Sequence, residues 1–292
     1  MSSPRPAPRP ALRPGALVLR RDRHHLQIGT SPGIVVADRP GLMGFLLSLD
    51  GTAETADVAR LHPMLDDPHG TVRELAALGA VVDARRWSPV AWRECRAQHP
   101  APTPVTERAQ YRVDVHADAG TTHFAEVVCD LLRACGVVHL DTSEPDLLVV
   151  VASAEPPRTV FTDAAAQGLD HLVVRCDERR VLIGPCVSPG ASPCIGCHDL
   201  HRADGDRAWS ALLPQFGARS PHHNPPAVPA LTLQAAAVEV AAAILGHLDG
   251  RSSALGAVVA VGPEHDARAV RPVTFHPRCP CTLLFMGAAS GS

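Results

Sequence analysis

Apolar positions divide the chain into two stretches with different patterns. In the first stretch, short alternating runs bounded by turn residues predict small antiparallel strands, and apolar residues at helical spacing follow them. The predicted strands cover residues 17–19, 26–28 and 34–36, with a last one near Arg85. The predicted helices cover residues 40–49, 55–61 and 68–78. This order of strands, three helices and a closing strand predicts a small winged-helix (α+β) module over residues 16–88.

The second stretch alternates strand-like and helix-like runs. The predicted strands cover residues 111–116, 137–140, 146–152 and 171–176. The predicted helices between them cover residues 122–135 and 159–167. Such alternation predicts an α/β domain with a parallel, doubly wound sheet. An alanine-rich run then predicts a long helix at 230–248, followed by strands at 257–261 and 270–275.

Proline and arginine mark the segments outside these two units. Residues 1–15 are rich in both and predict a disordered tail. Pro100, Pro102 and Pro104 indicate a linker over residues 89–110. The sheet domain is therefore expected at 111–283, and residues 284–292 are expected to form a second tail.

Composition narrows the classes of partner. The chain has 292 residues, of which 46% are hydrophobic, and its net charge is −3. All 27 basic residues are arginine, so no lysine is present to form a Schiff base. No long basic cluster points to nucleic acid. No signal peptide opens the chain and no apolar run reaches transmembrane length, so we expect a soluble, cytoplasmic protein without a membrane partner.

Four cysteines form two short pairs far apart in the sequence. Cys194 and Cys197 form a C-x-x-C motif in SPCIGCHDLHR, and Cys279 and Cys281 form a C-x-C motif in HPRCPC. Two thiolates from each of two such knuckles can supply the four ligands of a closed, tetrahedral Zn²⁺ site. The alternatives are surface thiols or two separate redox dithiols. We expect structural zinc, because both pairs lie in turn-forming sequence.

Polar residues follow the first cysteine pair. His198, Asp199, His201 and Asp204 lie within seven positions of one another. They could bind a metal or form a catalytic cluster. The interpretation that we favour is a helix start with polar contacts around the cysteine loop.

The sequence around the cysteines resembles a known family. The run GPCVSPGASPCIGCHDLHRADGDRAWSALLPQF at 184–216 and the closing HPRCPC at 276–281 resemble the zinc knuckle of the ThiF/MoeB-like superfamily, to which ubiquitin-activating enzymes belong. More narrowly they are similar to cyclodehydratase-type proteins of thiazole/oxazole-modified microcin (TOMM) pathways. The module at 16–88 is similar in plan to the PqqD-like recognition element of RiPP biosynthesis, which binds precursor leader peptides. The resemblance covers residues 16–283.

Catalytic members of this superfamily adenylate a C-terminal carboxylate with ATP and Mg²⁺. They need a glycine-rich turn after the first strand of the sheet, where backbone N–H groups approach phosphate. Here that turn is HADAGTTH, with Gly120 as its one glycine. Asp141 is the candidate for a ribose hydroxyl, and Ser153 stands where an active member has an aspartate for Mg²⁺. Gly120 and Asp141 would make up a residual nucleotide site, and we expect no ATP/Mg²⁺ chemistry.

The resemblance therefore implies a non-catalytic scaffold. It would bind a precursor peptide and present it to a modifying enzyme of the YcaO type, which forms azolines. The peptide would add a strand to a sheet edge in the first module, where we expect Leu17, Leu26 and Ile28 to shape the groove, flanked by the helix at 68–78. The alternatives are an ATP-dependent adenylyltransferase with a divergent site and a structural protein-interaction module. A second copy of the chain, forming a homodimer, is a further candidate partner.

Overall fold

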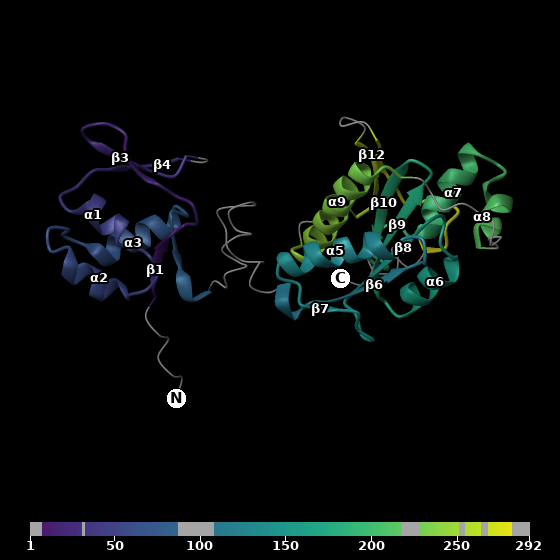
Figure 1. Ribbon diagram of the computed structural model, residues 1–292, viewed down its shortest axis with the longest axis horizontal. Helices are drawn as coiled ribbons and strands as arrows, with labels where there is room; N and C mark the ends of the chain where they lie inside the picture. Colours follow the sequence, from purple (N-terminus) through teal and green to yellow (C-terminus); the bar gives the residue numbers. More distant parts are fainter. Residues whose placement is uncertain are drawn as a thin grey trace. The chain divides into compact units, whose positions relative to one another are not determined.

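The chain contains two compact units, Met1–Glu107 and Arg108–Ser292, each with its own hydrophobic core (Figure 1). The structure, a computed structural model, describes residues 8–30, 33–86, 108–217, 228–250, 255–263 and 268–281. Most of the predicted linker and the predicted tail at 284–292 lie outside these residues.

The first unit combines two small antiparallel sheets with three helices. One sheet has the strand order β2-β3-β4 and the other pairs β1 with β5. The strands are β1 (Pro10–Leu12), β2 (Val18–Arg20), β3 (His25–Ile28), β4 (Ile34–Ala37) and β5 (Val81–Asp83). The helices are α1 (Leu42–Leu47), α2 (Thr55–Leu61) and α3 (Pro68–Ala77). The helices begin and end within two residues of the predicted positions.

The prediction that Leu26 and Ile28 shape a peptide groove is wrong. Both side chains are 0% exposed and belong to the core of the unit, together with Phe45, Leu46 and Leu75. Successive side chains of a strand point to opposite faces, and in β3 the inner face carries Leu26 and Ile28. Alternation revealed two faces, but it did not tell which of them would be covered by helices.

The prediction that residues 1–15 form a disordered tail is wrong for residues 10–12. Pro10–Leu12 form strand β1 and pair with Val81–Asp83. Ala11 is buried. Pro10 is the first residue of the strand, where the missing N–H is tolerated, so a proline-rich segment can still supply a short edge strand.

The second unit is built on a seven-stranded mixed sheet with the order β12-β11-β10-β9-β8-β6-β7. The strands are β6 (Arg112–Ala117), β7 (His139–Leu140), β8 (Leu147–Ala152), β9 (Asp170–Asp177), β10 (Arg180–Val187), β11 (Ala257–Val261) and β12 (Ala269–Pro272). The helices are α5 (Thr122–Ala134), α6 (Arg158–Ala166), α7 (Ile195–Gly205), α8 (Trp209–Gly217) and α9 (Ala230–Leu248). Helices α5 and α9 cover one face, and α6 to α8 lie on the other (Figure 1).

The expectation of a parallel sheet holds for one half only. Strands β6 to β9 pair in parallel, whereas β9 to β12 pair antiparallel. The two-residue connection from β9 to β10 permits only an antiparallel hairpin. Strand β10 was not predicted, because it contains Gly184 and Pro185, which usually indicate a turn. Here they coincide with an irregularity in the β9–β10 pairing, and a Cβ on Gly184 would lie 2.3 Å from the Ala257 carbonyl oxygen.

Helix α9 is a core helix. It is long and apolar enough to cross a membrane by length and composition alone. It packs, however, against α5 and the sheet, and Ala236, Val240 and Ile244 are 0% exposed. We therefore assign it to the hydrophobic core.

The end of the predicted linker belongs to the second unit. Arg108 is 0% exposed, and its guanidinium group binds both carboxylate oxygens of Asp249 at 2.9 and 2.5 Å. It also donates to the Cys135 carbonyl oxygen at 3.2 Å. The pair joins the start of the unit to the C-terminal end of α9, so residues 108–110 are not linker.

Replacing Arg108 with alanine should destabilise the second unit strongly. The change leaves Asp249 buried without its countercharge, and breaking a buried pair in this way costs about 3–5 kcal/mol. Urea denaturation followed by circular dichroism measures the loss. The matched control is Arg133→Ala, which removes an exposed pair with Asp130 and should cost less than about 1 kcal/mol. Equal stability of the two variants would contradict the assignment.

Candidate functional site

The four predicted cysteines converge on one place in the second unit. Cys194 precedes α7, Cys197 lies in its first turn, and Cys279 and Cys281 follow β12. All four Sγ atoms lie within 4.8 Å of one another. Contacts run between the two knuckles, with 3.5 Å from the Cys194 sulfur to that of Cys279 and 3.3 Å from the Cys197 sulfur to that of Cys281.

This cluster could bind a metal such as zinc. Tetrahedral Zn–S bonds of about 2.3 Å place the sulfur atoms about 3.8 Å apart, close to the observed separations. The four cysteines form no disulfide, and all four sulfur atoms gather in one cluster, which argues against two separate redox dithiols. Burial raises the pKa of the Cys194 thiol to about 11, so a bound cation would have to displace its proton.

Polar residues of α7 hold the second knuckle in place. The His276 backbone N–H donates to the Cys197 sulfur at 3.3 Å. The His276 ring contacts Asp204 at 2.8 Å, and Arg278 pairs with the same carboxylate. His201 contacts the Thr274 carbonyl oxygen at 3.0 Å. His201 and Asp204 thus bind the C-terminal segment, as the interpretation of polar contacts predicts.

A buried network of charges lies beside α7, and the sequence did not reveal it. Arg158, Arg175 and Arg202 all pair with the single carboxylate of Glu155. Arg158 also binds Asp199 through both oxygens, at 2.7 and 2.9 Å. Burial opposes ionisation of Asp199, but hydrogen bonds from His198 and Arg158 hold its pKa well below the usual value. The partners come from α6, β9, α7 and the loop before α6, so no local motif indicated them.

The turn after β6 is filled by a carboxylate of the chain itself. Asp118 Oδ1 accepts from the Gly120 backbone N–H and from the Thr121 hydroxyl, both at 3.0 Å. Asp118 Oδ2 accepts from the backbone N–H and the hydroxyl of Ser153, both at 2.7 Å. A Cβ on Gly120 would lie 3.2 Å from Ser153. Donors at the start of α5, where a phosphate would bind in a nucleotide site, are therefore occupied by an anion.

Asp141 has a conformational role in the structure. It follows β7, is exposed, and adopts a left-handed conformation with φ at +59°. Aspartate is one of the residues that tolerate this region in turns. Gly120 and Asp141 are thus both placed in turns, and within the described part of the chain no hydrogen bond or ion pair joins them in a shared site.

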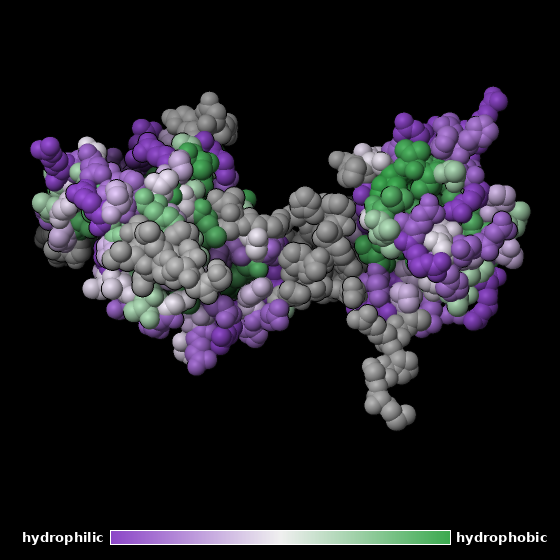
Figure 2. Space-filling model, turned by 180° about the vertical axis from the view of Figure 1, so that it is seen from behind, coloured by the Kyte–Doolittle hydropathy of each residue, from purple (hydrophilic) through white to green (hydrophobic). Residues whose placement is uncertain are grey.

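Apolar side chains lie on the outer face of the small sheet in the first unit. Leu19, Gln27 and Val35 are in register across β2, β3 and β4. Leu17 is 61% exposed, and Leu19 and Val35 are also exposed. Apolar surface is visible on this unit in Figure 2. Of the three predicted peptide-binding residues, only Leu17 is accessible, and Val35 was missed because its neighbours are equally apolar.

Comparison with known proteins shows the fold. No family model and no curated protein matches the chain. A heterocyclase structure, described as in complex with substrate and cofactor, aligns with a TM-score of 0.74 at 16% identity, over 94% of this chain and 39% of that one. The heterocyclase TruD aligns with a TM-score of 0.73 at 15% identity, over 94% and 42%. The chain thus spans about two fifths of their length.

A third similar structure aligns with this chain over nearly its whole length. E. coli MccB, crystallised with AMPCPP and MccA, aligns with a TM-score of 0.59 at 12% identity, over 92% of this chain and 98% of that one. At these identities the likenesses show the fold alone: the chain shares the fold of the two heterocyclase structures and of MccB, in line with the fold expected from the ThiF/MoeB-like resemblance.

Removing the Asp118 carboxylate should loosen the turn after β6. Asp118→Ala leaves the N–H groups of Gly120 and Ser153 without their acceptor, which costs about 2–3 kcal/mol of unfolding free energy. Asp118→Asn keeps an acceptor oxygen and should cost less. The control is Asp130→Ala on the exposed face of α5, with an expected change below about 0.5 kcal/mol. Urea denaturation compares the three, and wild-type stability of Asp118→Ala would contradict the structural role.

Proposed function

We propose that this chain is a non-catalytic, ThiF-like scaffold of a TOMM pathway. It binds a precursor leader peptide in its first unit and presents it to a separate YcaO-type enzyme that forms azolines. The likeness to a heterocyclase in complex with substrate supports this. The chain matches only 39% of that protein's length, and in this proposal a partner chain supplies the remaining activity. A winged-helix plan, which the sequence predicts for the first unit, would fit the same role.

The open edge of β4 is the observation that carries the proposal. Among the described residues, β4 is the last strand of its sheet and pairs only with β3. An extended peptide can continue such a sheet through backbone hydrogen bonds, while side-chain contacts give specificity. Val35 is exposed next to this edge.

Helix α3 lies close to the same edge. Arg39, just after β4, is within 3.4 Å of the Thr71 hydroxyl and 3.7 Å of the Glu74 carboxylate on α3. A cavity of 650 Å³ opens beside the end of β4 and is lined by basic side chains that include Arg20, Arg23 and Arg39. A peptide lying along β4 would reach this cavity, which also borders Arg20 at the end of β2.

We infer that the four cysteines hold a structural zinc ion. Four thiolates leave no open coordination position, so the ion would supply no reactive water. Its role would be to fasten the segment after β12 to the start of α7.

The alternative function is an ATP-dependent adenylyltransferase. The neighbour MccB has been crystallised with ATP, so the fold itself is compatible with nucleotide. The Asp118 carboxylate disfavours this function here, because it would repel phosphate from the turn after β6. We expect no nucleotide-dependent rise in the melting temperature (Tm), and a clear rise with ATP and Mg²⁺ would favour the enzyme. A structural protein-interaction module is the third hypothesis, which the absence of both peptide and nucleotide binding would favour.

Freshly purified protein should contain one zinc ion per chain, measured by elemental mass spectrometry. Cys194→Ser and Cys279→Ser should each lose the ion and lower Tm by about 10 °C, because metal-binding energy contributes to folding. Cys135→Ser, which changes a thiol outside the cluster, should keep the zinc. Wild-type protein without zinc would refute the site.

Peptide binding should depend on the β4 edge. Once a precursor peptide is in hand, Val35→Asp should weaken its binding to the full chain at least tenfold, because the charge must be desolvated beside the bound strand. Leu61→Asp alters another exposed apolar residue, on α2, and should leave the affinity unchanged. Isothermal titration calorimetry measures both, and circular dichroism verifies that each variant is folded. Unchanged binding by Val35→Asp would move the site away from this edge.

A further inference from the structure

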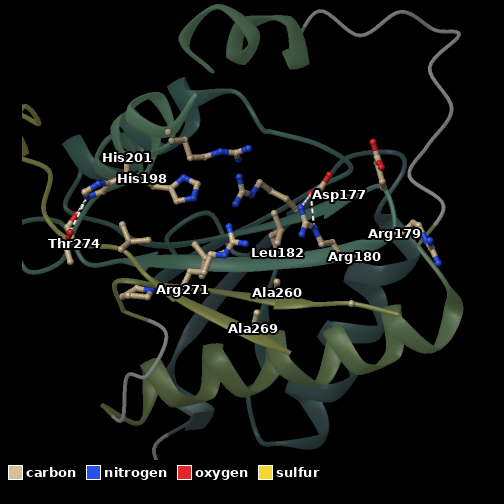
Figure 3. A pocket seen from close by; sticks show the side chains of 18 of the residues that line it. Asp177, Arg179, Arg180, Leu182, His198, His201, Ala260, Ala269, Arg271 and Thr274 are labelled. Carbon is tan, nitrogen blue, oxygen red and sulfur yellow. Dashed lines mark hydrogen bonds and ion pairs between the residues drawn. The ribbon is translucent and has the colours of Figure 1, made fainter. Parts of the chain in front are cut away.

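The second unit contains a large open cavity on the face of the sheet opposite α5 and α9. Its volume is 1100 Å³. Side chains of β9 to β11 form the floor, α7 forms one wall and β12 the other, and the β9–β10 turn closes one end. Figure 3 shows Asp177, Arg179 and Arg180 at that end and His198 and His201 at the other. We call this cavity the basic trough.

The trough is strongly cationic. Five arginines line it, against two acidic residues, Asp177 and Glu178. The arginines are Arg175, Arg179, Arg180, Arg202 and Arg271. Arg180 is paired with Asp177. Arg179 and Arg271 form no ion pair within the described part of the chain.

The buried arginine in the trough is incompletely satisfied. Arg175 is 3% exposed, and it shares the Glu155 carboxylate with Arg158 and Arg202. Its Nε has no hydrogen-bond partner among the described residues. That nitrogen is itself buried, so the acceptor oxygens of a ligand in the trough would meet the exposed arginines, Arg179 and Arg271.

The floor of the trough indicates that the ligand also carries apolar groups. Leu182, Val258 and Ala260 supply apolar surface between the charged walls. A lone phosphate or carboxylate ion would leave this apolar surface exposed to water and would fill only a small part of the cavity. A chain that presents both acidic and apolar side chains would contact walls and floor together.

We propose that the basic trough binds an acidic segment of peptide. This inference rests on the proposed function only in taking the occupant to be a peptide. The trough would be a second binding site for that peptide, separate from the β4 edge of the first unit. Two weak sites that hold one peptide together give a higher affinity than either site alone.

A synthetic probe tests the trough without knowledge of the natural ligand. The probe is a fluorescein-labelled peptide of alternating leucine and glutamate, and its binding to the full chain is followed by fluorescence anisotropy. Arg271→Glu should weaken binding roughly tenfold, because it replaces attraction by repulsion at an exposed wall. Arg133→Glu makes the same change of charge on α5, on the other face of the sheet, and should leave the affinity within about twofold.

Three competitors or variants of the probe show whether binding depends on an acidic peptide: a glutamine peptide, inorganic phosphate and ATP. A matched peptide with glutamine in place of glutamate should bind at least tenfold more weakly, and inorganic phosphate or ATP at equal ionic strength should not displace the acidic probe. Equal binding of the glutamine peptide, or displacement by phosphate or ATP, would overturn the proposal. So would an absence of binding, or equal binding by Arg271→Glu and wild type.

The Val35→Asp variant separates this inference from the proposed function. It should bind the acidic probe as wild type does. Loss of probe binding in this variant, with retention in Arg271→Glu, would place the acidic site in the first unit and overturn the trough, while leaving the scaffold role intact. Failure of the scaffold role would instead appear as precursor binding that is insensitive to Val35→Asp.

Discussion

The convergence of four cysteine sulfurs is the constraint on which the C-terminal half of the second unit depends. They lie within 4.8 Å of one another although more than 80 residues separate the two pairs. The cluster encloses α7, α8, α9, β11 and β12 in one loop, and it holds the segment that contains Cys279 and Cys281 against the start of α7. Closing so long a loop costs conformational entropy, which a bound metal ion would offset. One wall of the basic trough is α7 and the other is β12, so the trough depends on this closure.

A second constraint is the carboxylate of Asp118. It accepts hydrogen bonds from the Gly120 N–H before α5 and from the Ser153 N–H after β8. The chain thus places its own anion in the turn after β6, where we propose that it disfavours phosphate. In the proposed scaffold, the surfaces that bind peptide are the β4 edge in the first unit and the trough in the second.

Sequence patterns predicted the features of the structure that depend on residues close together in the chain. Helices α5 and α9 and strands β6, β8 and β9 follow from periodicity, and the cysteine cluster followed from two short motifs. The patterns failed where the outcome depends on distant partners. Leu26 and Ile28 were assigned to a groove because alternation does not say which face helices will cover. Strand β10 was missed because Gly184 and Pro185 usually indicate turns, and the Glu155 network joins residues from separate elements.

Native mass spectrometry of the full chain, purified gently from the cells that make it, tests the central claim most directly. One spectrum reports metal, nucleotide and peptide together. The scaffold account predicts a species with the mass of the chain, one zinc ion and one short peptide, whose sequence fragmentation would give. A species that carries a nucleotide and no peptide would contradict the account and favour an enzyme.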